Sequence, residues 1–261
     1  MRTLFVLLLS LAISTVVQAK VVGKEVTYKA DGVELKGYLA YDNSSKAKRP
    51  GVLVVHEWWG HNDYARKRAR MLAKLGYIAF ALDMYGEGKQ AAHPQDAGKF
   101  AGEVRKNLPM ATARFKAAMD QLQNHPLFDK GKMAAIGYCF GGAVVLEMAR
   151  SGMELQGVAS FHGSLGTAQP AETGKVKAKV LVMNGGADPF VKEEEIAAFK
   201  TEMSQAGVDF NFISYPGAKH SFTNPGANKF GKKFKLPLEY NKQADKKSWR
   251  ELQAFLKKIF N

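Results

Sequence analysis

The sequence predicts one α/β domain over residues 20–261, with a mainly parallel central sheet, an N-terminal antiparallel hairpin and helices on both faces. Short continuous apolar runs alternate with helical patterns of roughly 10 to 15 residues, which is typical of parallel strands buried on both faces. Hydrophobic residues make up 46% of the 261-residue chain, so a sizeable core can form. No internal repeat or low-complexity linker divides this segment, which favours one domain over two.

Residues 1–19 are expected to be a secretory signal peptide. Arg2 provides a basic start, an apolar run extends from Leu4 to about Val17, and the small residues Val17 and Ala19 precede Lys20 at the spacing of a cleavage site. The apolar run is too short for a membrane span. We therefore expect cleavage after Ala19, export to the periplasm or secretion, and no stable membrane anchor.

The elements of the domain can be assigned in chain order. The turn signal Ala30-Asp31-Gly32 predicts a hairpin between strands at 25–29 and 35–41. Apolar runs predict buried strands at 51–55 and 77–82, and further strands are predicted at 133–136, 158–161, 179–183 and 209–215. Helical periodicity, with glycines just after two of the segments, predicts helices at 63–75, 109–122, 142–150, 193–206 and about 239–260.

The chain is strongly basic, with a formal net charge of +14. A basic face attracts phosphates, but no nucleic-acid recognition motif is present, so we expect solvated surface charge and no nucleic-acid partner. A single cysteine allows no intrachain disulfide, although export would permit one. These features favour a monomer that acts on a small molecule.

The single cysteine, Cys139, lies in the segment Gly137-Tyr138-Cys139-Phe140-Gly141, between a predicted strand and a predicted helix. This is the spacing of a nucleophile elbow, in which glycines leave room where the strand and helix backbones crowd together. The helix N-terminus would favour the thiolate over the thiol. A lone cysteine can also be a small core residue. The flanking glycines favour the nucleophile.

Polar residues follow four of the predicted strands, and the carboxyl ends of parallel strands converge on one crevice. Glu57 follows strand 51–55, Cys139 follows 133–136, Asp188 follows 179–183 and His220 follows 209–215. The order nucleophile, acid, histidine is the order found in α/β-hydrolases. Taken alone, Asp188 could be a turn residue before Pro189, and His220 could be a surface histidine.

The chemistry of these residues suggests a role for each. His220 can accept the thiol proton and return it to the leaving group, so the rate should fall on the acid side as this histidine protonates. Asp188 would orient the imidazole, and Cys139 would form a thioester acyl-enzyme. The backbone N–H groups of Phe140 and Trp58 are the expected oxyanion donors.

Three residues near the predicted crevice allow two interpretations each. Glu57, next to two tryptophans, is either a partly desolvated carboxylate with a raised pKa or a solvated loop acid. Trp59 and Tyr85 are predicted to line a substrate pocket, although aromatic residues near strand ends are also ordinary core.

Together these motifs resemble the dienelactone hydrolase family of α/β-hydrolases from about Lys24 to Phe260. The resemblance rests on four motifs, which are H-E-W-W-G at 56–60, G-Y-C-F-G-G at 137–142, D-P-F-V at 188–191 and K-H-S-F at 219–222. It implies a Cys139-His220-Asp188 triad and neither a metal nor an organic cofactor. It also implies that Glu57 contacts the resting thiol and swings on substrate binding to help generate the thiolate.

The chain departs from this family in its substrate-binding residues. The arginines that hold a substrate carboxylate in the family have no counterpart at 83–87 or 222–224, and Lys89 could substitute only in part. We therefore expect hydrolysis of a small ester, lactone or thioester. The alternatives are a thiol-based redox protein, which lacks a resolving cysteine, and a catalytically lapsed binding protein on the same fold.

Overall fold

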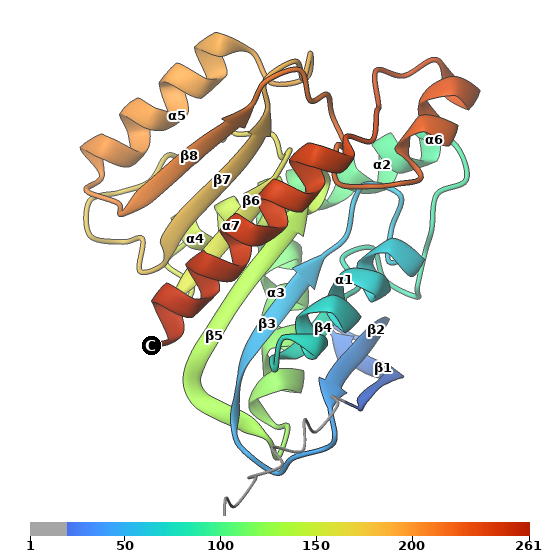
Figure 1. Ribbon diagram of the computed structural model, residues 1–261, viewed down its shortest axis with the longest axis vertical. Coiled ribbons are helices and arrows are strands. Elements are labelled where there is room, and N and C mark those ends of the chain that lie inside the picture. Colours follow the sequence, from blue (N-terminus) through green and yellow to red (C-terminus); the bar gives the residue numbers. More distant parts are fainter. Residues whose placement is uncertain (1–19) are drawn as a thin grey trace, which may run out of the picture.

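The structure is a computed structural model and describes residues 20–261. It contains an eight-stranded sheet in the order β1-β2-β4-β3-β5-β6-β7-β8, with helices packed on both sides (Figure 1). β1 pairs antiparallel with β2 and β2 antiparallel with β4, whereas all other neighbours are parallel. The predicted fold class is confirmed. The predicted signal peptide, residues 1–19, lies outside the described residues.

The strands lie where apolar runs predicted them, with some ends extended. The N-terminal hairpin turns at Asp31 and Gly32, which both have positive φ, as a tight turn with the twist of its strands requires. β5 begins before the apolar run that marked it, at Phe128. The strands are β1 Val21–Ala30, β2 Val33–Asp42, β3 Arg49–Val55, β4 Ile78–Leu82, β5 Phe128–Tyr138, β6 Gly157–Phe161, β7 Lys179–Gly185 and β8 Phe210–Tyr215.

Two apolar clusters cover the two faces of the sheet. Because side chains alternate along a strand, Leu53 and Val55 of β3 enter one cluster and Val52 and Val54 enter the other. The first cluster includes side chains of α2, α3, α4 and α5, and the second includes side chains of α1 and α7. In Figure 1, α1 and α7 lie in front of the sheet and α3 and α4 behind it.

The helices are α1 Asp63–Lys74, α2 Pro94–Lys106, α3 Leu108–Gln123, α4 Phe140–Arg150, α5 Glu193–Gln205, α6 Ala227–Phe234 and α7 Lys242–Phe260. Of these, α2 and α6 were not predicted from the sequence. The buried face of α2 consists only of Ala97, Ala101 and Val104, and two glycines weaken its helical pattern. α6 is short and rich in lysine. No helix within residues 20–261 is long and apolar enough to cross a membrane.

Candidate active site

Cys139 lies on a sharp turn between β5 and α4, and its backbone has φ 54° and ψ −117°. Such a conformation is strained for a residue with a side chain, and it is held by close packing of the flanking backbone. A Cβ on Gly137 would lie 1.9 Å from the carbonyl oxygen of Gly141, and one on Gly141 would lie 2.4 Å from that of Val55. Only glycine fits at these two positions. The predicted elbow is therefore present in the backbone.

The amide of Cys139 is held from the neighbouring strand. It donates to the carbonyl oxygen of Phe161 at 2.9 Å and to Nδ1 of His162 at 3.1 Å. The side chain is half-buried and packs against the same apolar cluster as Val144 of α4. Cys139 thus stands at the N-terminus of α4, as predicted, with a firmly anchored backbone.

His220 and Asp188 form a close pair. Nδ1 of His220 lies 2.7 Å from Oδ2 of Asp188, and the other carboxylate oxygen, Oδ1, accepts from the amide of Phe190 at 2.9 Å. Both residues are largely buried. Burial by itself lowers the pKa of His220. Attraction to the charge of Cys139 and the hydrogen bond to Asp188 outweigh burial and raise the pKa to about 10. The imidazolium is therefore the favoured form of His220 at neutral pH.

The backbone around His220 is held by a segment from much later in the chain. The amide of Glu239 donates to the carbonyl oxygen of His220 at 3.1 Å, and Leu238 forms a parallel bridge with His220. Ser221, directly after the histidine, has φ 59°. The segment that follows α6 thus helps to fix the loop that carries the histidine.

Glu57 is buried, with 2% of its surface exposed, and it accepts two hydrogen bonds. Oγ of Ser221 donates to Oε1 at 2.9 Å, and Nδ2 of Asn224 donates to Oε2 at 2.5 Å. Burial raises the pKa of Glu57, and these two hydrogen bonds oppose the shift. The sequence allowed either a desolvated or a solvated carboxylate at Glu57, and in the structure this carboxylate is desolvated. The hydrogen bonds found for the carboxylate of Glu57 in residues 20–261 come from Ser221 and Asn224, whereas the resemblance implied a contact with the thiol.

The loop that carries Glu57 is fixed by His56. Nε2 of His56 accepts from the amide of Met84 at 3.2 Å, so Nδ1 carries the proton and donates to the carbonyl oxygen of Glu57 at 2.6 Å. The ring is fully buried, and burial lowers its pKa. His56 is therefore a neutral structural histidine. It orients the loop in which Trp58 was predicted to supply an oxyanion donor.

The two predicted pocket residues are both nearly buried among other rings. Trp59, 2% exposed, stacks on Phe230 of α6 with ring centroids 4.5 Å apart. Tyr85 packs against His56 and Phe140, and its hydroxyl donates to the carbonyl oxygen of Trp58 at 2.9 Å. Tyr85 thus supports the loop of Trp58, and Trp59 attaches α6 to the same loop.

A second histidine, His162, lies beside the elbow and was not predicted to belong to the site. It is fully buried at the end of β6, and its ring centroid lies 5.3 Å from that of His220. Burial and the nearby charge of His220 hold its pKa well below the usual value. The search for polar residues after strand ends would have found it, because it directly follows the strand predicted at 158–161.

A buried polar chain extends from His162 away from the elbow. Nε2 of His162 lies 2.7 Å from Oγ1 of Thr223, which lies 2.6 Å from the hydroxyl of Tyr64. Arg68 donates to that hydroxyl at 3.1 Å, to the carbonyl oxygen of Thr223 and to Asp245. The guanidinium of Arg68 is thus fully engaged within the protein and is buried.

Lys89 pairs with Glu87 at 2.9 Å on the surface. It therefore does not take the place of the arginines that are missing at 83–87 and 222–224. Within residues 20–261, no group of three or more histidine, cysteine, aspartate or glutamate side chains is arranged to hold a metal ion.

The structure brings Cys139 next to His220, whose ring is paired with Asp188. A thiol and an imidazole so placed can act as nucleophile and proton donor. The amide nitrogens of Phe140 and Trp58 have no hydrogen bond described within residues 20–261, which leaves them free to bind a developing oxyanion.

Comparison with known proteins identifies the family of the chain. The model of the dienelactone hydrolase family matches residues 35–260. Protein usf of Aquifex pyrophilus is 30% identical over 207 residues, which cover 77% of this chain and 87% of that protein.

Two solved structures share the fold. A dienelactone hydrolase-like promiscuous phosphotriesterase from metagenomic libraries is 33% identical, with a TM-score of 0.86 over 92% of this chain and 99% of that one. A dienelactone hydrolase of Anabaena variabilis is 22% identical, with a TM-score of 0.59 over 85% of this chain and 100% of that one, and shows the fold alone.

Proposed function

The chain belongs to the dienelactone hydrolase family, and from this premise we propose that it is an exported hydrolase of small esters, lactones or thioesters with Cys139 as its nucleophile. Family membership supports ester or lactone hydrolysis. The observation that carries the choice of nucleophile is the strained elbow at Cys139 beside His220, whose Nδ1 lies 2.7 Å from Asp188.

In the proposed acylation step, the thiolate of Cys139 attacks the carbonyl carbon of the substrate, and a carbon–sulfur bond forms. The carbonyl oxygen becomes an oxyanion, which the amides of Phe140 and Trp58 stabilise. When the intermediate collapses, the carbon–oxygen bond to the leaving group breaks, and the alkoxide takes the proton from His220. The products are an alcohol and a thioester on Cys139.

In the proposed deacylation step, neutral His220 removes a proton from water as the water oxygen attacks the thioester carbon. The carbon–sulfur bond then breaks, and the thiolate leaves. The carboxylic acid departs, and the Cys139 thiolate again faces the imidazolium of His220. Asp188 keeps the proton on Nδ1 of His220, so that Nε2 faces the reacting atoms throughout.

Glu57 is assigned a supporting part in generating the thiolate. Its raised pKa makes it a better proton acceptor than an exposed glutamate. To reach the thiol, the carboxylate must leave Ser221 and Asn224, so its movement on substrate binding would exchange two hydrogen bonds for one with the sulfur. This assignment rests on the burial of Glu57 and on the family resemblance.

Phosphotriester hydrolysis is a second candidate activity, favoured by the 33% identity to the promiscuous phosphotriesterase. The same thiolate would attack phosphorus, forming a sulfur–phosphorus bond and releasing an aryloxide, and water would then release the phosphodiester. Turnover of a dialkyl 4-nitrophenyl phosphate that depends on Cys139 would establish it.

Export is proposed from residues 1–19 of the sequence. The mature protein is expected in the periplasm or the medium with Lys20 at its N-terminus. Measurement of the intact mass of material from each fraction tests this, and an exported protein that retains Met1 would contradict cleavage.

The decisive test is the substitution Cys139→Ala, assayed with 4-nitrophenyl acetate and a simple lactone. Loss of turnover in a folded protein is expected, while Ser151→Ala, at the exposed end of the same helix, serves as the matched control. Unchanged esterase activity in Cys139→Ala would falsify the proposal. Peroxide consumption dependent on Cys139 without esterase activity would favour a thiol redox protein, and neither activity would favour a lapsed binding protein.

A further inference from the structure

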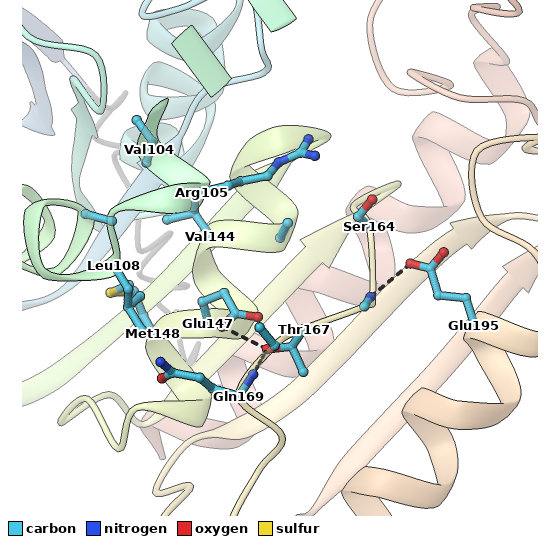
Figure 2. A pocket seen from close by; sticks show the side chains of 14 residues that line it. Val104, Arg105, Leu108, Val144, Glu147, Met148, Ser164, Thr167, Gln169 and Glu195 are labelled. Carbon is cyan, nitrogen blue, oxygen red and sulfur yellow. Dashed lines mark hydrogen bonds between the residues drawn. The ribbon is translucent and has the colours of Figure 1, made fainter. Parts of the chain in front are cut away.

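A cavity of about 470 Å³ lies between α2, the start of α3, α4 and the loop that follows β6. None of the residues singled out in the sequence lines it. Figure 2 shows Val104, Leu108, Val144 and Met148 gathered on one side, with Ser164 and Glu195 across from them. Its volume is in the range of pockets that bind small molecules.

The cavity begins beside the elbow and extends away from it along α4. Ala143 is one of the residues that line the cavity, and its backbone amide donates to the carbonyl oxygen of Cys139 at 3.3 Å. Val144 lies in the same first turn of α4, and Glu147 and Met148 lie one turn further on. At about 1.5 Å per residue, Met148 lies about 14 Å along the helix from the level of Cys139. Cys139 itself packs against the apolar cluster that contains Val104 and Val144.

The two carboxylates of the cavity are already paired within the protein. Glu147 accepts from Arg150 at 2.8 Å and from Thr167 at 3.1 Å. Glu195 accepts from the amides of Leu165 and Gly166 at 2.6 and 2.9 Å. A ligand that binds through these carboxylates would therefore have to break existing hydrogen bonds, which costs free energy.

Five apolar side chains of the lining belong to or pack against the core cluster that Cys139 also contacts: Val104, Leu108, Ala111, Val144 and Met148. Arg105, on an exposed residue of α2, also lines the cavity. On α4 the apolar row extends from Val144, in the turn that follows Cys139, to Met148. Such a row fits an extended hydrocarbon chain whose carbonyl carbon stands at the sulfur.

We propose that this cavity binds the acyl group of the substrate, and that the preferred substrates are esters of unbranched aliphatic acids of medium length. The assignment rests on the proposed esterase function and adds its substrate class. Transfer of each methylene from water to the cavity should raise kcat/KM by roughly fourfold, until the chain fills the cavity.

The test is a series of 4-nitrophenyl esters from acetate through butanoate and hexanoate to octanoate, hydrolysed by the full protein. Rising kcat/KM with chain length is expected in the unaltered protein. Ala143→Leu fills the cavity next to the nucleophile and should lower the hexanoate-to-acetate ratio of kcat/KM by about tenfold or more, whereas Ala254→Leu on an exposed turn of α7 should not change it.

Leu108→Trp, at the start of α3, provides a second variant should Ala143→Leu fail to fold. A flat chain-length series, or a ratio that both cavity variants leave unchanged, would overturn the proposal. So would faster hydrolysis of a monosuccinate ester than of the butanoate, lost in Arg105→Gln, since an anionic acyl group would then be preferred. Acetate hydrolysis that survives Cys139→Ala would instead remove the proposed function itself.

Discussion

Nδ1 of His162 accepts a hydrogen bond from the backbone amide of Cys139, 3.1 Å away. A nitrogen that accepts in this way carries no proton, so the ring is neutral in the folded protein and Nε2–H faces Thr223. His162 therefore helps to hold the elbow only while it stays unprotonated. This dependence makes the fold of the site sensitive to acid.

The first prediction is that stability falls with pH below about 6.5. The pKa of His162 is depressed in the folded state, by burial and then by His220, so below the unfolded pKa near 6.5 the unfolded chain binds more protons. The pKa of His56 is lowered as well, and that of His61 is lowered to about 3. As the pH falls, each of these three histidines should reduce the free energy of unfolding by about 1 kcal/mol per pH unit.

Urea unfolding between pH 7 and pH 5 measures this loss. His162→Phe removes one titrating group and should reduce the slope, although it also removes an acceptor and lowers stability at pH 7 by about 1–3 kcal/mol. His93→Asn, at the exposed N-cap of α2, is the matched control. An unchanged slope in His162→Phe would show that its ring titrates equally in both states.

The second prediction concerns the orientation of His220. Asp188→Asn keeps the shape of the side chain but favours the wrong tautomer, so kcat should fall by about a thousandfold or more with a smaller change in KM. Asp209→Asn, which alters a surface carboxylate paired with Lys179 at 2.8 Å, should leave kcat within about twofold. Equal effects of the two substitutions would mean that the pair of His220 and Asp188 does not act in turnover.

The third prediction is an alkaline decline in the rate for an ester with a poor leaving group. Because the pKa of His220 is raised to about 10, the proton donor is retained at neutral pH and lost as the pH rises through about 10. This pKa reflects the coupling of His220 to its neighbours and is not a property of one residue.

Stopped-assay hydrolysis of an alkyl ester from pH 5 to pH 11 checks this profile, with 4-nitrophenyl acetate as the comparison. The aryl ester has a good leaving group and should show no alkaline decline. An alkyl ester whose rate does not decline through about pH 10 would count against His220 as the proton donor.

The fourth prediction concerns the glycines of the elbow. Gly141→Ala would place a Cβ 2.4 Å from the carbonyl oxygen of Val55, so β3 and α4 must separate. We expect a loss of about 1–3 kcal/mol of stability or more, together with most of the activity. Gly98→Ala, in the interior of α2 with open space around it, should instead gain about 0.4–1 kcal/mol. Thermal unfolding of both variants decides the matter, and a stable, active Gly141→Ala would contradict the close packing.

The sequence was informative about the site because its residues lie just after strands. Cys139, Asp188 and His220 each follow a predicted strand, and parallel strands deliver their carboxyl ends to one edge of a sheet. The same reasoning applied to β6 would have reached His162. α2 was not predicted because its buried face consists of little more than alanine. That helix forms one wall of the cavity along α4.

The sequence by itself determined the order of the strands, the elbow and the candidate nucleophile, acid and base, because these depend on local periodicity and spacing along the chain. Only the tertiary structure decided that Glu57 meets Ser221 and Asn224 and that Trp59 stacks on Phe230 of α6. It also placed a cavity along α4, starting in the helix turn that follows Cys139. These contacts join residues far apart in the chain, so burial, hydrogen-bond partners and the resulting pKa shifts arise only when the loops pack together.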